Sequence, residues 1–202
     1  MQTMMNLVAA MAVTLAGGAS AATISDDGPH RGEGLTLDAS DFASSGPCGS
    51  GVSVVEDGCS VLLKQESATD PTDFGRFAPI DTQWIDSQDL EEVTWTVEND
   101  TPFTSLTFAL TDASDQENSF FSMTVDGATW TTGSERRANG TLDWITVTFD
   151  EAVTETSLDF RTRYNDGWGI QAASISPVPV PASGAMLVFG LVGLAAAHRR
   201  KR

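Results

Sequence analysis

The sequence predicts an all-β fold, an antiparallel β-sandwich of jelly-roll-like character, flanked by an N-terminal signal peptide and a C-terminal transmembrane helix. Three observations predict the sandwich. Apolar and polar side chains alternate with period two over several short runs, turn-forming residues separate these runs, and no helical stripe of comparable strength lies between the two ends of the chain. Regularly spaced short strands with one apolar face are typical of antiparallel sandwiches.

The predicted strands each carry this alternation. In EEVTWTVEN, Val93, Trp95 and Val97 alternate with polar residues, so Trp95 is expected in the core. The predicted strands are 91–99, 105–112, 120–127, 142–150, 157–164 and 169–176. The turns between them are expected at Asn99-Asp100-Thr101-Pro102, Asp126-Gly127, Asn139-Gly140 and Asn165-Asp166-Gly167.

Composition limits the classes of partner. The chain has 202 residues, 11 Lys and Arg against 28 Asp and Glu, and a formal net charge of −17. Such a surface repels phosphate backbones, so we expect no nucleic-acid partner. Aromatic and β-branched residues are plentiful, which favours a packed core over disorder. The length suits one domain plus targeting segments.

The N-terminus has the pattern of a secretory signal peptide. Residues 7–16, LVAAMAVTLA, form a short apolar run, and Ala19-Ser20-Ala21 supplies an A-x-A cleavage pattern. We therefore assign 1–21 to the signal peptide, with cleavage after Ala21. The segment before the run lacks Lys and Arg, which departs from the usual pattern, and the competing interpretation is an ordinary buried helix.

The C-terminus has the pattern of a membrane anchor. Residues 182–197 carry no charge and would reach about 24 Å as a helix at 1.5 Å per residue. The basic stop signal that follows stays cytoplasmic while the signal peptide exports the body, residues 22–176. That stop signal consists of Arg199, Arg200, Lys201 and Arg202. Prolines at 177, 179 and 181 predict an extended spacer that a processing protease can bind.

Residues 177–202 contain a proline-spaced motif, then an apolar helix, then a basic end. This order resembles the PEP-CTERM class of bacterial sorting signals, in its VPLPA-type variant. The motif residues are Val178, Pro179, Val180, Pro181 and Ala182. The variant prefers Leu where this chain has Val180. The resemblance implies an exosortase-like processing protease, cleavage near the motif, and delivery to the cell surface or extracellular matrix of a Gram-negative bacterium. The alternative is a plain C-terminal anchor that is never cut.

Cys48 and Cys59 both fall in the exported body, where disulfides persist. We expect them to pair, which would contribute about 3 kcal/mol in the chain-entropy account. Metal ligation is the competing interpretation, and it lacks a nearby histidine.

The sequence offers few residues that could form a catalytic site. The two histidines are His30, in a Gly- and Asp-rich lead-in, and His198, in the tail. Neither a nucleophile motif nor a phosphate-binding loop occurs. A pair of carboxylates, as in glycoside hydrolysis, is the remaining route to an enzyme. We expect no such facing pair among Asp112, Asp115, Glu117, Asp143, Asp159 and Asp166.

No cofactor is required by the sequence, and calcium is the candidate ion. The segment TDASDQEN, 111–118, offers Asp112, Asp115 and Glu117 as oxygen ligands between two strands, although a solvated polar turn would look the same. The segment YNDGWGIQAASI also resembles the closing D-G-[FW]-G-I-D-[ND] strand common in domains of this sorting class. Gln171 replaces the usual acid there, which puts any metal role of that position in doubt.

Two classes of function remain. Trp168 follows a turn and is the best candidate among the tryptophans for exposure and for stacking on a sugar ring. We expect a non-catalytic protein of the cell surface or extracellular matrix, associated with exopolysaccharide. The alternative is a secreted, carboxylate-dependent glycoside hydrolase.

Overall fold

The computed structural model describes residues 21–26, 28–29, 32–44, 60–65, 78–117, 120–163 and 166–179. The fold is all-β and antiparallel, as expected, and within the described residues its one helical element is the 3-10 turn η1, Ala39–Asp41. The strands are β1 Ala22–Ser25, β2 Glu33–Gly34, β3 Phe42–Ser44, β4 Leu62–Lys64, β5 Trp84–Asp86, β6 Glu92–Thr111, β7 Phe121–Val125, β8 Ala128–Thr131, β9 Leu142–Thr162 and β10 Gly169–Pro177.

A ribbon of two long strands organises the sheet. β6 and β9 pair antiparallel, with Glu92 opposite Arg161 at one end and Thr111 opposite Leu142 at the other. The remaining strands extend this ribbon in the order β4-β5-β10-β6-β9-β7-β8, while β1 pairs with β9, β2 with β10 and β3 with β6. Residues that lie far apart in the sequence therefore meet along almost every strand.

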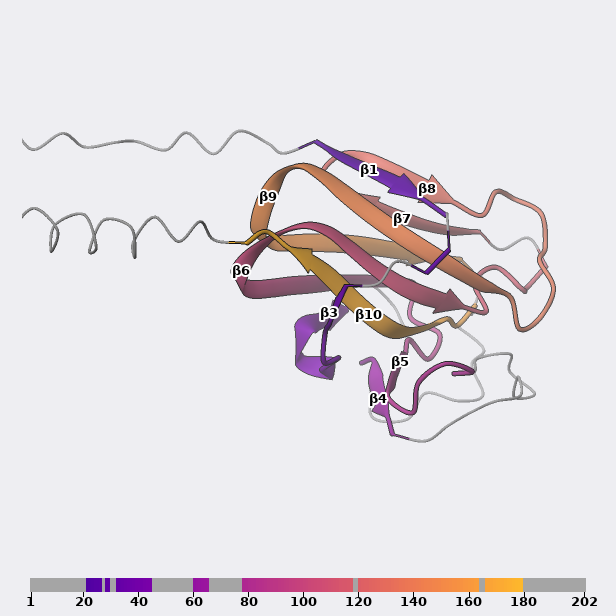
Figure 1. Ribbon diagram of the computed structural model, residues 1–202. Helices are drawn as coiled ribbons and strands as arrows, with labels where there is room; N and C mark the ends of the chain where they lie inside the picture. Colours follow the sequence, from indigo (N-terminus) through magenta and orange to yellow (C-terminus); the bar gives the residue numbers. More distant parts are fainter. Residues whose placement is uncertain are drawn as a thin grey trace, which may run out of the picture.

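Both long strands bend at the same place. The pairing register shifts between Glu98 and Ser105 of β6, and Figure 1 shows β6 and β9 curling back at one end of the molecule. The chain reversal expected at 99–102 is therefore wrong, as is the separation of 142–150 from 157–164. Pro102 has no N–H to donate to a ladder, so the pairing is interrupted there, but the partner strand bends with β6 and the ribbon continues.

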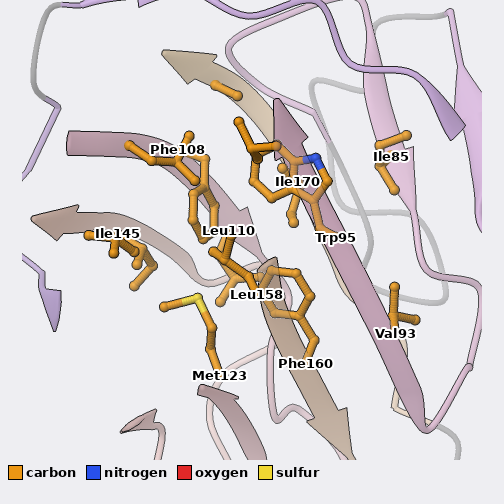
Figure 2. Close-up of a cluster of buried hydrophobic side chains, with 14 of the residues drawn as sticks. Ile85, Val93, Trp95, Phe108, Leu110, Met123, Ile145, Leu158, Phe160 and Ile170 are labelled. Carbon is orange, nitrogen blue, oxygen red and sulfur yellow. The ribbon is translucent and has the colours of Figure 1, made fainter. Parts of the chain in front are cut away.

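The bend divides the ribbon into two layers. The first layer joins the start of β6 and the end of β9 to β3, β7 and β8. The second layer joins the rest of both strands to β1, β5 and β10. Aromatic and aliphatic side chains fill the space between them, as Figure 2 shows for Trp95, Phe108 and Phe160. Trp95 is 2 % exposed, which confirms its expected place in the core.

The alternation expected from the sequence holds in β7 and in the first part of β6, whereas residues 106–111 at the end of β6 are all buried. In β7, Phe121, Met123 and Val125 are buried and the residues between them are partly exposed. β7 leads into β8 through the expected turn at Asp126-Gly127, whose φ angles of 46° and 82° suit a tight two-residue hairpin. β8 was not expected from the sequence, and it forms the edge of the first layer.

The two ends of the folded body lie at the bend. Ala22 of β1 pairs with Phe149, and Pro177 of β10 pairs with Phe103. The rings of Phe103 and Phe149 pack edge to face, with centroids 5.8 Å apart. Figure 1 shows the start of β1 and the end of β10 on the side where β6 and β9 curl back. The body therefore begins and ends on one side.

Several sequence-based predictions fall on residues outside those described. They concern residues 1–20, Cys48, Cys59, Val180, Pro181, Ala182 and the basic cluster Arg199 to Arg202. Within the described part of the chain, the structure contains no helix that is long and apolar enough to cross a membrane.

Candidate functional site

The outer surface of the first layer carries two straight rows of polar side chains. One row crosses four adjacent strands, β6, β9, β7 and β8, and a second row lies two residues further along each strand. The first row consists of Thr94, Asp159, Thr124 and Thr129, and the second of Glu92, Arg161, Ser122 and Thr131. Together with the neighbouring pair Thr96 and Ser157, we call these residues the hydroxyl face.

Strand periodicity puts these side chains outside. Val93, Trp95, Met123, Leu158 and Phe160 are each 2 % exposed or less and point into the core. The residues between them in sequence must point the other way, because successive side chains of a strand alternate between the two faces. The same residues that build the core therefore also fix the hydroxyl face.

Hydrogen bonds tie neighbouring strands together across this face. The Thr94 hydroxyl donates to Asp159 Oδ1 over 2.7 Å, and the hydroxyls of Thr124 and Thr129 share a bond of 3.2 Å. Such chains of hydroxyl and carboxylate groups hold each side chain in one orientation. The face consequently presents ordered donors and acceptors rather than mobile ones.

One cation stands on the hydroxyl face. Arg161 Nη2 lies 3.1 Å from Glu92 Oε1, with the two side chains 64 % and 40 % exposed. An ion pair this exposed contributes about 1 kcal/mol or less, because water screens it. Both groups can therefore exchange this contact for one with a ligand at small cost.

Three open hollows follow the outward residues of β6. The first has a volume of about 450 Å³ and is lined by both rows, among them Thr94, Ser122 and Asp159. The second, about 360 Å³, lies between η1, β3 and β6, and the third, about 640 Å³, lies at the bend. Glu98 lines both the second and the third. We call the three hollows together the polar groove.

The middle of the polar groove is acidic. Burial, reinforced by the nearby charges of Asp38 and Glu98, raises the pKa of Asp41. The pKa of Asp38 is lowered, first because the backbone N–H of Ser40 donates to its carboxylate and then because the Ser40 hydroxyl does. Glu98 also stands directly opposite Glu155 across β6 and β9. Like charges opposite one another are unfavourable, so this region disfavours anionic ligands.

The acids proposed as calcium ligands separate in the structure. Asp112 and Asp115 are buried, whereas Glu117 is exposed. Asp112 Oδ1 accepts a hydrogen bond from the backbone N–H of Gly140 over 3.0 Å, so this carboxylate fixes the turn expected at Asn139-Gly140. Over the described ranges, no three His, Cys, Asp or Glu side chains are grouped so that they could hold a metal ion.

Trp168 is buried, so its expected exposure and sugar stacking are wrong. The side chain is 1 % exposed and packs against Phe160 and Phe121, with ring centroids 4.8 and 5.8 Å away. The backbone N–H of Trp168 donates to Ser87 Oγ, and the backbone carbonyl of Trp168 accepts from the backbone N–H of Ser87. The free energy gained by burying a large aromatic side chain outweighs the local preference of a turn residue for the surface.

Gln171 has a structural role in the second layer. Its Oε1 accepts hydrogen bonds from the backbone N–H groups of Ile80 and Asp81, over 2.9 and 3.1 Å. The side chain thereby fastens residues 78–81 onto the outer surface of the second layer. A carboxylate oxygen would accept the same two bonds, so the amide here keeps the geometry without the charge.

Sequence reasoning missed the hydroxyl face, although a signal was present. The segment Thr-Trp-Thr occurs at 94–96 in β6 and again at 129–131 in β8, and its two threonines point outward while the tryptophan points inward. Each segment alone is an ordinary amphipathic strand. Only the pairing register shows that Thr94 and Thr129 lie in one row.

No protein-family model matches the chain, and no curated protein sequence matches it. Among solved structures, the insecticidal crystal protein Cry2Aa is similar over 47 % of this chain and 17 % of its own, at 13 % identity and a TM-score of 0.31. The Agl-KA catalytic domain is similar over 87 % of this chain and 30 % of its own, at 12 % identity and a TM-score of 0.36. The chain spans less than a third of either protein.

Proposed function

We propose that this protein is an exported, non-catalytic component of the cell surface or extracellular matrix that binds exopolysaccharide through the polar groove. In this proposal, a jelly-roll-like sandwich lies between a signal peptide, 1–21, and a sorting signal, 177–202. The long β6–β9 ribbon that passes from one layer into the other supports the jelly-roll part.

The observation that carries the binding function is the lining of the first hollow. Each sugar hydroxyl both donates and accepts a hydrogen bond, and Thr94, Ser122 and Thr124 have the same dual capacity. Asp159 adds an acceptor and Arg161 adds a donor. A volume of about 450 Å³ falls within the usual range for small-molecule sites and suits one or two sugar rings.

The shape of the groove supports a polymer rather than a single sugar. Its three hollows follow the outward residues of one strand, from Glu92 to Glu98, and continue to Asp100 at the bend. The excess of carboxylates favours a neutral or cationic polysaccharide over an anionic one. The same charges oppose nucleic acid.

The sequence supports the proposed export to the cell surface and the two proposed partners, a processing protease and the membrane. The apolar run before Ala21 and the order of motif, apolar segment and basic end at the other terminus indicate export followed by recognition by an exosortase-like protease. The membrane would hold the precursor through its C-terminal helix. The two ends of the body lie together at the bend, which suits a body held at one side with its hydroxyl face open to the matrix.

Binding to an array of neutral, amino-sugar and uronic-acid polysaccharides tests the proposal. We expect Thr124→Val and Asp159→Asn each to weaken binding about tenfold, because the first removes a hydroxyl from the first hollow and the second replaces a charged acceptor oxygen with an amide N–H₂ donor. Thr148→Val is the matched control, since Thr148 is an exposed strand residue of the second layer. Unchanged binding in both groove variants would contradict the proposal. Turnover of the polymer would instead favour the hydrolase.

A further inference from the structure

The chain joins the last strand to the proposed sorting motif without a gap. β10 ends at Pro177, which pairs with Phe103 of β6. The next residue, Val178, is the first residue of the motif V-P-V-P-A, and its backbone N–H donates to the carbonyl of Pro102 over 2.7 Å. Val178 is half-buried and Pro179 is exposed. The motif therefore begins directly at the end of the sheet, with its first residue still hydrogen-bonded to the body.

This hydrogen bond has no substitute nearby. Pro177 and Pro179 lack N–H groups, so Val178 carries the one backbone donor of residues 177–179. Its acceptor, Pro102, precedes Phe103, which is fully buried and packs on Phe149. The end of β10 is consequently fixed to the part of the body where β1 also begins.

We propose that the folded body extends through Val178, so that the protease that releases the tail cuts the chain after Val178 and not before it. Proteases cut chain segments that are exposed and locally released from hydrogen bonds. A cut before Val178 would first require the end of β10 to separate from β6, whereas a cut between Val178 and the exposed Pro179 leaves β10 paired along its whole length.

The inference rests on the proposed function only in taking the tail to be a processed sorting signal. Hydrolysis breaks one peptide bond, and water supplies the hydroxyl of the new carboxylate and the proton of the new amine. The acyl side stays with the body. The mature protein would then end in a short stub held beside its own N-terminus, with β10 complete.

Limited proteolysis of the full chain with a nonspecific protease tests where the resistant body ends, and it does not require the sorting enzyme. The fragments are identified by intact mass. We expect the resistant fragment to end at Val178 or later. A resistant fragment ending at Pro177 or earlier would overturn the inference.

A pair of proline variants tests the hydrogen bond itself. Val178→Pro removes the donor and should raise the rate of cutting within 172–177 about fivefold, because the strand end opens more often. Val180→Pro adds a proline to the same motif without removing the Val178 N–H, and should cut like the wild type. Equal rates in the two variants would overturn the role of the bond.

The C-terminus of the protein isolated from its producing cell gives an independent reading. A mature chain that has lost part of the tail and ends at Val178 or later agrees with the inference, and one that ends earlier contradicts it. A chain that keeps residues 179–202 would instead contradict the sorting part of the proposed function, while the proteolysis experiment would still decide the inference.

Discussion

Trp95 and Phe108 belong to one strand, β6, yet their rings meet edge to face across the core, with centroids 5.5 Å apart and planes at 81°. The contact exists because β6 bends between them and carries Trp95 in the first layer and Phe108 in the second. Phe108 also meets Phe160 of β9 edge to face, with centroids 6.2 Å apart. The bend of the ribbon is thus held by the aromatic core that it creates.

Removing the Phe108 ring should therefore loosen both layers. We expect Phe108→Ala to lower the free energy of unfolding by about 3–5 kcal/mol, because the side chain is fully buried and leaves a cavity. Urea unfolding monitored by tryptophan fluorescence measures the loss. Thr129→Ala, at an exposed position of β8, is the control and should change the value by less than about 1 kcal/mol.

The pairs Arg137–Asp143 and Arg161–Glu92 should differ in their contribution to stability. Arg137 binds both carboxylate oxygens of Asp143 at 2.6 Å, and these side chains are 25 % and 8 % exposed. The hydrogen bonds to Asp143 raise the pKa of Arg137, so the guanidinium stays charged. Arg137→Ala should cost about 2 kcal/mol, since it leaves a buried carboxylate without its partner.

Arg161→Ala is the matched comparison for Arg137→Ala. Its partner Glu92 is 40 % exposed, so the loss should be below about 1 kcal/mol. Thermal unfolding of the two variants at equal ionic strength measures the difference. Equal losses would show that burial does not separate the two pairs.

Gly169 should tolerate no side chain. A Cβ placed there would lie 2.7 Å from Thr111 Oγ1 and 3.2 Å from Cε3 of the Trp84 ring. We expect Gly169→Ala to cost about 2 kcal/mol, because the sheet and the ring must move apart. Gly34→Ala is the control, since a Cβ there meets nothing within 4 Å. Chemical unfolding of both variants decides the point, and equal stabilities would contradict the close packing.

Asp41→Asn should stabilise the protein at neutral pH. Burial first, and then the charges of Asp38 and Glu98, raise the folded-state pKa of Asp41, so its ionised form opposes folding above that pKa. The variant should melt at a higher temperature than the wild type at pH 7. This gain should shrink as the pH falls through the raised pKa, because the wild-type carboxyl then becomes protonated. Asp126→Asn, in an exposed turn, controls for the general loss of negative charge.

A pH-independent gain for Asp41→Asn would contradict the electrostatic explanation. A new hydrogen bond made by the amide would explain such a gain instead. Melting curves at pH 7 and at pH 3 on both variants distinguish a gain that depends on pH from one that does not.

The sequence by itself determined the local part of this structure. Period-two alternation is a property of a single strand, so it predicted the all-β class, the burial of Trp95 and the inward faces of β6, β7 and β9. The turn at Asp126-Gly127 was likewise predictable, because Asp and Gly tolerate the positive φ angles that a tight hairpin requires.

The tertiary structure alone decided how these strands are placed. Whether the chain at 99–102 reverses or bends depends on the partner strand, and β9, which begins about forty residues further on, bends with it. Trp168 was drawn into the core by Phe121 and Phe160, which come from two other strands. The hydroxyl face exists only because the register aligns Thr94, Asp159 and Thr124, and register depends on long-range pairing that no local pattern contains.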